Sequence, residues 1–140
     1  MIPVVAAVIR KGDTFLLARR PLRKRHGGLW EFPGGKVAEG EGETAALARE
    51  LQEELGVRLL RSREVEAAIR DPGSPFEIRF RSAEIEGTPR ALEHVELRWV
   101  TRTEALALEL APSDRRFLES LNAPNHPAKD CETLDPEAEP

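Results

Sequence analysis

Residues 35–57 read GKVAEGEGETAALARELQEELGV, and this stretch decides the fold. Leucines recur at positions 47, 51 and 55, a spacing that predicts one amphipathic helix over 42–55. Gly56 follows directly and is expected to end that helix, because glycine readily adopts the left-handed conformation common at helix C-termini. We therefore expect one well-delimited helix in the first half of the chain.

Three carboxylates share one side of this helix. At about 100° per residue, Glu50, Glu53 and Glu54 fall within an arc of roughly 100° that borders the leucine stripe. Like charges at these spacings cost roughly 0.2–0.5 kcal/mol per pair, whereas a hard divalent cation such as Mg²⁺ would turn the repulsion into ligation. Arg49 precedes Glu53 by one turn and is expected to orient it through a charge-assisted hydrogen bond. A solvated acidic helix face is the other explanation of the pattern.

The remaining sequence predicts a mixed α/β domain around this helix. Short apolar and β-branched runs predict strands over 4–9, 14–18, 65–70, 76–85 and 97–101. Two shorter helices are expected over 103–108 and 112–121. The intervening segment 19–36 carries basic residues and glycine pairs, which predict a loop.

Length and composition narrow the class of protein. The 140 residues, with a net charge of -4, leave room for one domain, and the charge argues against a protein that binds along nucleic acid. No apolar run approaches the ~20 residues of a membrane span. Cys131 is the single cysteine, so an internal disulfide is excluded. We expect a cytoplasmic domain over 1–121, followed by a disordered tail over 122–140 whose prolines and acids offer little to bury.

Beyond the helix itself, the stretch from Gly35 resembles the box that defines Nudix hydrolases. That box reads Gly, five residues, Glu, seven residues, then Arg-Glu-aliphatic-any-Glu-Glu-any-Gly-aliphatic, and every fixed position is filled here. A chance match in a chain of this size has a probability well below roughly one in a million. The runs 18–20, 29–36 and 110–114 resemble the MutT branch of the family, so the resemblance covers roughly 2–121.

The resemblance implies a fold and a reaction. The fold is the Nudix α/β/α sandwich (class α/β, or α+β), in which a mixed sheet lies between helices. The reaction is hydrolysis of a nucleoside diphosphate linked to a further group, with Mg²⁺ or Mn²⁺ as cofactor. In MutT-like members a nucleoside triphosphate gives the monophosphate and pyrophosphate. We therefore expect a pyrophosphohydrolase that removes modified or surplus (d)NTPs.

Carried over residue by residue, the resemblance also implies a metal centre. Glu50, Glu53 and Glu54 are the implied metal ligands, helped by the carbonyl of Gly35. MutT-like enzymes recruit a carboxylate from a later loop, and Glu93 is the candidate here, with an ordinary surface acid as the alternative. The metals would neutralise phosphate charge and lower the pKa of a bound water. Which of Glu50, Glu53 and Glu93 takes the proton of that water stays open.

Residues around the metal ligands receive supporting roles from the same resemblance. Arg49 is implied to orient a ligand carboxylate, and Glu41 to brace the loop against the helix. Lys36, inside the box, is expected to contact the substrate. The basic segment 19–25 either faces the phosphates or is a solvated basic loop.

Base recognition is implied for Arg20, Glu31, Phe32 and Asp114. Arg20 could donate to a base carbonyl, and Phe32 could stack on the ring; a solvated arginine and a core phenylalanine are the alternatives. An ionised Asp114 only accepts hydrogen bonds, which suits an amine such as cytosine N4 or the N1 and N2 donors of guanine. A helix N-cap is the alternative for Asp114. The 110–114 run and the Glu93-His94 pair resemble the cytidine-type group of MutT-like proteins.

Two other functions remain open. One keeps the box but acts on ADP-ribose, a dinucleoside polyphosphate or a nucleotide sugar. The other is a non-catalytic Nudix module that senses a ligand, which the complete set of box carboxylates disfavours. In each case we expect a small nucleotide as partner, no nucleic-acid polymer, no membrane, and a monomer or homodimer.

Overall fold

The computed structural model describes residues 1–121, and the tail expected over 122–140 lies outside the described residues. Its strands are β1 (Ile2–Lys11), β2 (Thr14–Arg19), β3 (Trp30–Glu31), β4 (Gly34–Lys36), β5 (Arg58–Ile69), β6 (Phe76–Glu86) and β7 (Glu96–Thr101). Its helices are α1 (Glu43–Leu55), α2 (Arg102–Leu106) and α3 (Pro112–Ser120). Within the described range, no helix has the length and apolarity needed to span a membrane.

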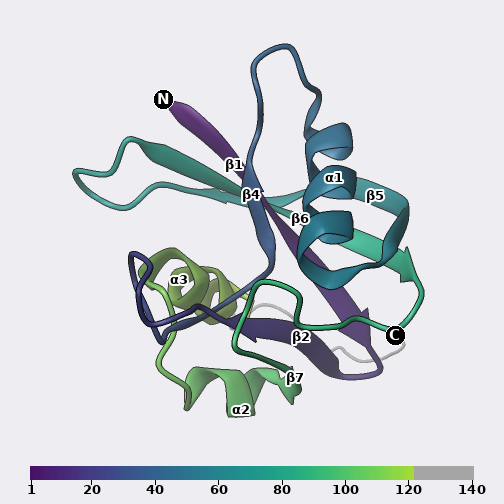
Figure 1. Ribbon diagram of the computed structural model, residues 1–140. Helices are drawn as coiled ribbons and strands as arrows, with labels where there is room; N and C mark the ends of the chain where they lie inside the picture. The colour runs from purple at the N-terminus through teal and green to yellow at the C-terminus, as the bar shows by residue number, and fades with distance from the viewer. Residues whose placement is uncertain (122–140) are drawn as a thin grey trace.

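Strand β1 is the centre of a seven-stranded mixed sheet (Figure 1). The main path runs β3-β2-β1-β6-β5, with β4 paired to β1 and β7 paired to β2. Strands β1 and β6 are parallel, whereas the pairs that β1 makes with β2 and β4 are antiparallel. This combination confirms the mixed sheet expected from the sequence.

The sheet is covered on both faces because β1 alternates its side chains between two cores. Val5, Ala7 and Ile9 pack with the leucines of α1. Ala6 and Val8 belong to the other cluster, which includes the buried side chains of α2 and α3. Figure 1 accordingly shows α1 on one side of the strands and α3 on the other. The α/β/α arrangement is therefore confirmed.

The predicted elements agree with the structure except at short or irregular segments. Strands β3 and β4 lie inside the segment expected to be loop, because two or three residues carry too little periodicity to show a strand. Strand β5 begins at Arg58 rather than near residue 65. Its ladder with β6 contains register shifts, which break the simple alternation that identifies a strand.

The C-terminal end of α1 positions a later loop. Gly56 adopts the expected left-handed conformation, with φ of 68°. The N–H of Arg90 then donates to the carbonyl of Leu55 at 2.9 Å, and the N–H of Leu92 donates to that of Glu54 at 3.1 Å. Helix carbonyls left without intrahelical partners are thus satisfied by this loop. The residues that follow it, including Glu93, are brought to the acidic end of α1.

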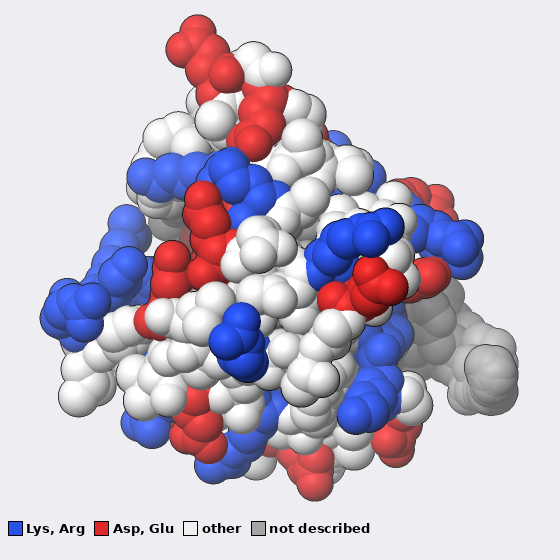
Figure 2. Space-filling model, turned by 45° about the vertical axis from the view of Figure 1, so that its right-hand side comes forward, with Lys and Arg blue, Asp and Glu red and all other residues white. Residues whose placement is uncertain are grey.

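Charged side chains of both signs are spread over the face of the molecule that Figure 2 shows. Acidic and basic side chains are interspersed there, and neither covers it continuously.

Candidate active site

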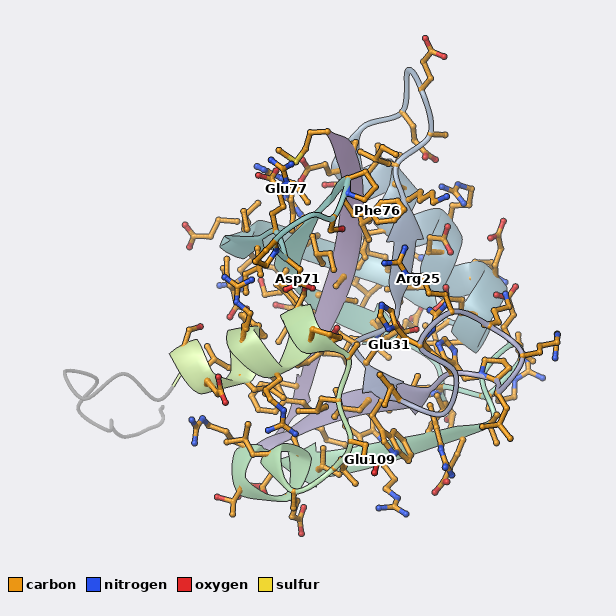
Figure 3. All side chains as sticks on the ribbon, turned by 90° about the vertical axis from the view of Figure 1, so that its left-hand side faces the viewer. Arg25, Glu31, Asp71, Phe76, Glu77 and Glu109 are labelled. Atoms are coloured by element: carbon orange, nitrogen blue, oxygen red, sulfur yellow. The ribbon has the colours of Figure 1, made fainter. Side chains whose placement is uncertain are left out.

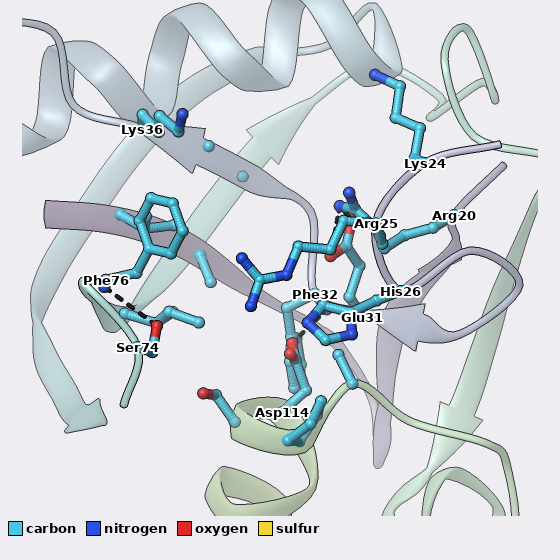
Figure 4. Close-up of a pocket in the computed structure, with 18 of the residues that line it drawn as sticks. Arg20, Lys24, Arg25, His26, Glu31, Phe32, Lys36, Ser74, Phe76 and Asp114 are labelled. Atoms are coloured by element: carbon cyan, nitrogen blue, oxygen red, sulfur yellow. Dashed lines mark hydrogen bonds and ion pairs between the residues drawn. The ribbon is translucent and has the colours of Figure 1, made fainter. Parts of the chain in front are cut away.

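A pocket of about 720 Å³ lies between β1, β4, the loop before β3, the β5–β6 loop and the start of α3 (Figure 4). It brings together most of the predicted site residues from distant parts of the chain. Those that line it are Arg20, Glu31, Phe32, Gly35, Lys36, Glu54, Glu93 and Asp114. Three others lie on α1 outside the lining, namely Arg49, Glu50 and Glu53.

The carboxylates of α1 differ in their surroundings. Glu54 is only 7% exposed, and its Oε1 accepts the N–H of Gly34 at 3.3 Å. Burial, together with the hydrogen bond and charge of Glu50, raises the pKa of Glu54 to about 9. Glu50 packs directly on Gly35, where a Cβ would overlap the Glu50 carboxylate. A side chain at position 35 would therefore displace the Glu50 carboxylate from the place it occupies against β4.

Arg49 braces the loop before α1. It donates to Glu41 from Nε at 3.0 Å and from Nη2 at 2.9 Å, and Glu41 also accepts the N–H of Ala38 at 2.9 Å. These bonds lower the pKa of Glu41 to about 2 and show that Glu41 ties loop to helix, as expected. Arg49 also donates to Glu50 at 2.9 Å, whereas Glu53 lies 3.6 Å away as an ion pair. Among the carboxylates of α1, Arg49 thus hydrogen-bonds Glu50 rather than the predicted Glu53.

His94 lies between Glu31 and Glu54 in the pocket, and the sequence had assigned it no role. Its side chain is 6% exposed, and Nε2 lies 3.0 Å from Oε2 of Glu31. Nδ1 lies 4.0 Å from Oε1 of Glu54 and is buried with no hydrogen-bond partner in the part of the chain that the structure describes. The available signal was its place beside Glu93, but nothing local showed that it reaches Glu31.

Arg20 and Glu31 form an ion pair in the lining of the pocket. Nη1 of Arg20 lies 3.2 Å from both carboxylate oxygens of Glu31, and Nε donates to the carbonyl of Arg25 at 2.7 Å. Arg20 is therefore held in place, and the alternative of a solvated strand-end arginine is wrong.

Asp114 lies at the inner end of the pocket, 5% exposed, and accepts the N–H of Phe32 at 2.9 Å. Burial, followed by the charge of Glu31, raises the pKa of Asp114 well above its usual value. The N-cap of α3 is Ala111, so the capping alternative for Asp114 is wrong. Phe32 packs edge-on against Phe117 with 5.4 Å between ring centroids, and its core alternative is confirmed, although it also lines the pocket.

Basic side chains line the pocket from two opposite walls. Lys24, Arg25 and His26 line it from the loop before β3, and Figure 4 shows Arg25 reaching across toward Ser74 and Phe76. From the opposite wall, Nζ of Lys36 lies 5.3 Å from the ring centroid of Phe76. Part of the basic segment thus faces the pocket, where an anionic ligand would meet it.

Comparison with known proteins identifies the family. The sequence profile of the NUDIX domain matches residues 1–121. The chain belongs to the NUDIX family. The CTP pyrophosphohydrolase of Escherichia coli (strain K12) is 41% identical over 125 residues, covering 88% of this chain and 93% of the relative. The putative 8-oxo-dGTP diphosphatase 2 of Mycobacterium tuberculosis (strain ATCC 25618 / H37Rv) is 42% identical over 126 residues, covering 84% and 86%.

Solved structures show the same Nudix fold. The solution structure of the E. coli ORF135 protein matches with a TM-score of 0.75 and 41% identity, covering 92% of this chain and 95% of that one. The crystal structure of a MutT NUDIX hydrolase from Burkholderia pseudomallei matches with a TM-score of 0.75 and 29% identity, covering 84% and 95%. The expected enzyme class is thereby confirmed, and the chain is a Nudix hydrolase of the MutT type.

Nudix hydrolases generally need a divalent metal and act on small nucleotides, and the donor set here fits such a metal. In the conformation described over 1–121, no three His, Cys, Asp or Glu side chains converge to hold an ion, and the side chain of Glu53 is 52% exposed. The raised pKa of Glu54 beside Glu50 nevertheless marks two carboxylates forced together. A hard cation relieves that repulsion, because it prefers carboxylate oxygens.

Proposed function

We propose that this Nudix hydrolase converts nucleoside triphosphates to the monophosphate and pyrophosphate in the presence of Mg²⁺, with Mn²⁺ as a substitute. The observation that carries the proposal is one continuous pocket with two unlike ends. Its inner end holds the buried Asp114, and its other end is bordered by Glu54 at the acidic side of α1. A base would enter the first and a polyphosphate would extend toward the second.

The metal would be held by Glu50, Glu53 and Glu54, with the Gly35 carbonyl and Glu93 completing the donors. When bound, the cation neutralises phosphate charge and lowers the pKa of the attacking water. Arg49 keeps Glu50 in place through the hydrogen bond already described.

The phosphates would also meet the protein's own cations. Lys36 on β4 and Arg25 on the opposite loop both line the pocket, and both carry charge complementary to a triphosphate. The proton of the attacking water would pass to one of Glu50, Glu53 and Glu93, and single substitutions at these positions would separate them.

We assign base selection to Asp114, with Arg20 and Glu31 from the same pocket lining. The carboxylate of Asp114 would accept from an exocyclic amine such as cytosine N4, and a raised pKa lets the same group donate when protonated. A cytidine nucleotide is the preferred substrate in this proposal, supported by the relative named CTP pyrophosphohydrolase. An 8-oxo-dGTP activity is the second candidate, supported by the M. tuberculosis relative.

A substrate panel with Mg²⁺ tests the proposal. It contains CTP, dCTP, 5-methyl- and 5-hydroxy-dCTP, dGTP, 8-oxo-dGTP and ADP-ribose, with pyrophosphate and free phosphate scored separately. Preferred cleavage of cytidine nucleotides with pyrophosphate release supports the cytidine proposal, and preference for 8-oxo-dGTP supports the second candidate. Activity on ADP-ribose alone overturns both while leaving the metal centre intact.

The remaining expectations belong to the same proposal. A cytoplasmic location fits an enzyme that acts on the nucleotide pool by removing modified or surplus triphosphates. One Nudix domain over 1–121, and a monomeric or homodimeric state, complete it.

A further inference from the structure

The β5–β6 loop forms one wall of the pocket and is held together by hydrogen bonds of its own. In the turn 71–74, the N–H of Ser74 donates to the carbonyl of Asp71 at 3.0 Å, and Gly73 has a φ of 77°. Proline and glycine at the two central positions suit such a turn. Arg70 then donates to the carbonyl of Ser74 at 3.0 Å. The turn is thus closed by hydrogen bonds of its own backbone and of Arg70, which leave the carboxylate of Asp71 available to partners outside the turn.

The carboxylate of Asp71 bonds to the first turns of α3. Oγ of Ser113 donates to Oδ2 of Asp71 at 2.7 Å, and Nη1 of Arg116 donates to Oδ1 at 3.0 Å. Figure 3 shows Asp71 directly above the N-terminal end of α3. Ser113 is buried, whereas Arg116 is half exposed, so the bond to Ser113 is the less screened of the two.

Ser113 and Asp114 are adjacent, and they tie α3 to two different walls of the pocket. Ser113 binds the β5–β6 loop, while Asp114 accepts the N–H of Phe32 from the segment between β3 and β4. A displacement of Ser113 would move Asp114 with it, because both lie in the same helical turn. These two contacts together fix the first turn of α3 against two walls of the pocket, the β5–β6 loop and the segment between β3 and β4.

We propose that Asp71 is a positioning residue for base selection, which tethers the β5–β6 loop to Ser113 and thereby holds Asp114 in place to read the base. The inference rests on the proposed function, because it takes Asp114 as the group that reads the base. The charge of Asp71 also contributes to the raised pKa of Asp114, an effect that the variants below separate from the tether.

The test compares Asp71→Ala, Asp71→Asn and Ser113→Ala with the wild-type chain. Asparagine keeps an oxygen that can accept from Ser113 but removes the charge, and alanine removes both. Asp13→Ala, in the exposed turn between β1 and β2, is the matched control. Dissociation constants for CMP and GMP are measured by calorimetry, and kcat and KM for CTP and dGTP by pyrophosphate release. Urea unfolding confirms that each variant folds.

Asp71→Ala and Ser113→Ala are each expected to raise KM and Kd for the preferred nucleotide about tenfold, with a much smaller change in kcat. Their double variant should be little worse than either single one, because both remove the same bond. Asp71→Asn should recover most of the lost affinity. Asp13→Ala should behave as the wild type does.

Two results would overturn the inference while leaving the proposed function in place. In the first, Asp71→Ala discriminates between the two nucleotides as well as the wild type does. In the second, Asp71→Asn is as damaging as Asp71→Ala, which would make charge rather than the tether responsible. A wild-type chain that binds all bases alike would overturn the proposed base selection together with this inference, and is recognised without any variant.

Discussion

The imidazole of His94 lies with Nε2 3.0 Å from Oε2 of Glu31, which places a side chain of the β6–β7 loop against β3. The same ring presents Nδ1 toward Glu54 at 4.0 Å. The loop that carries His94 is itself bonded to the last carbonyls of α1. Residues assigned to the base and to the metal are therefore parts of one packed unit.

Removing the contact between His94 and Glu31 should lower both the stability of the fold and the affinity for the nucleotide. His94→Asn is too short to reach Glu31, so that carboxylate would retain only Arg20. We expect the free energy of unfolding to fall by about 1–3 kcal/mol and KM to rise. A double-mutant cycle with Glu31→Ala, measured by urea unfolding, should give a coupling of at least ~1 kcal/mol. Additive single effects would show that the two side chains do not depend on each other.

Glu53→Gln should lower turnover by at least ~10²-fold while leaving the fold intact, because a metal-ligand carboxylate is lost without a change of volume. Steady-state kinetics with Mg²⁺, combined with thermal unfolding, provides the measurement. Glu39→Gln, an exposed position between the fixed residues of the box, is the matched control. Near-normal activity of Glu53→Gln would refute its assignment as a ligand.

Glu54 should make the metal-free protein less stable as pH rises. The folded state keeps its proton up to a pKa of about 9, whereas the unfolded chain releases it near 4.5. The stabilising contribution is therefore complete below pH 4.5 and is lost progressively as pH rises toward 9.

The measurement is Tm against pH in EDTA for the wild type and Glu54→Gln. The wild type should lose more stability between pH 5 and pH 8, by on the order of 1–3 kcal/mol relative to the variant. Mn²⁺ at pH 8 should restore the wild type more than the variant, because ligand binding stabilises the folded state. Parallel pH profiles for the two proteins would contradict the buried, protonated state of Glu54.

Two substitutions at Asp114 should affect the stability of the fold and the choice of base separately. Asp114→Ala leaves the N–H of Phe32 without its acceptor, which should lower the free energy of unfolding by about 1–3 kcal/mol. Asp114→Asn keeps an acceptor for that N–H, so it should remain close to wild-type stability while its preference among the panel nucleotides changes. Urea unfolding at pH 7.5 and the substrate panel measure the two effects. An Asn variant with unchanged preference would remove Asp114 from base reading.

Local patterns predicted the elements that depend on nearby residues. The leucine spacing and Gly56 identify α1 and its end, because helical periodicity and a left-handed cap act within a few residues. The same segment contains the complete family box, from which the fold class and the hydrolase activity followed. Strands β1 and β2 were also located closely, because a tight turn between apolar runs is a local signal.

Tertiary structure alone decided which side chains meet. The sequence predicted that Arg49 orients Glu53. In the fold, the loop before α1 brings Glu41 to the Arg49 guanidinium, and the hydrogen bond that Arg49 makes within the helix goes to Glu50. Asp114 meets the backbone of Phe32, 82 residues away in the chain.

The sequence by itself thus determined the family, the acidic helix and the chemistry of its side chains, since these depend on residue type and short-range spacing. Only the fold brings His94 close to both Glu31 and Glu54, and Asp71 into contact with Ser113 on α3. These contacts join residues that no local pattern relates, and they form because packing on the two faces of one sheet brings distant loops to a common pocket.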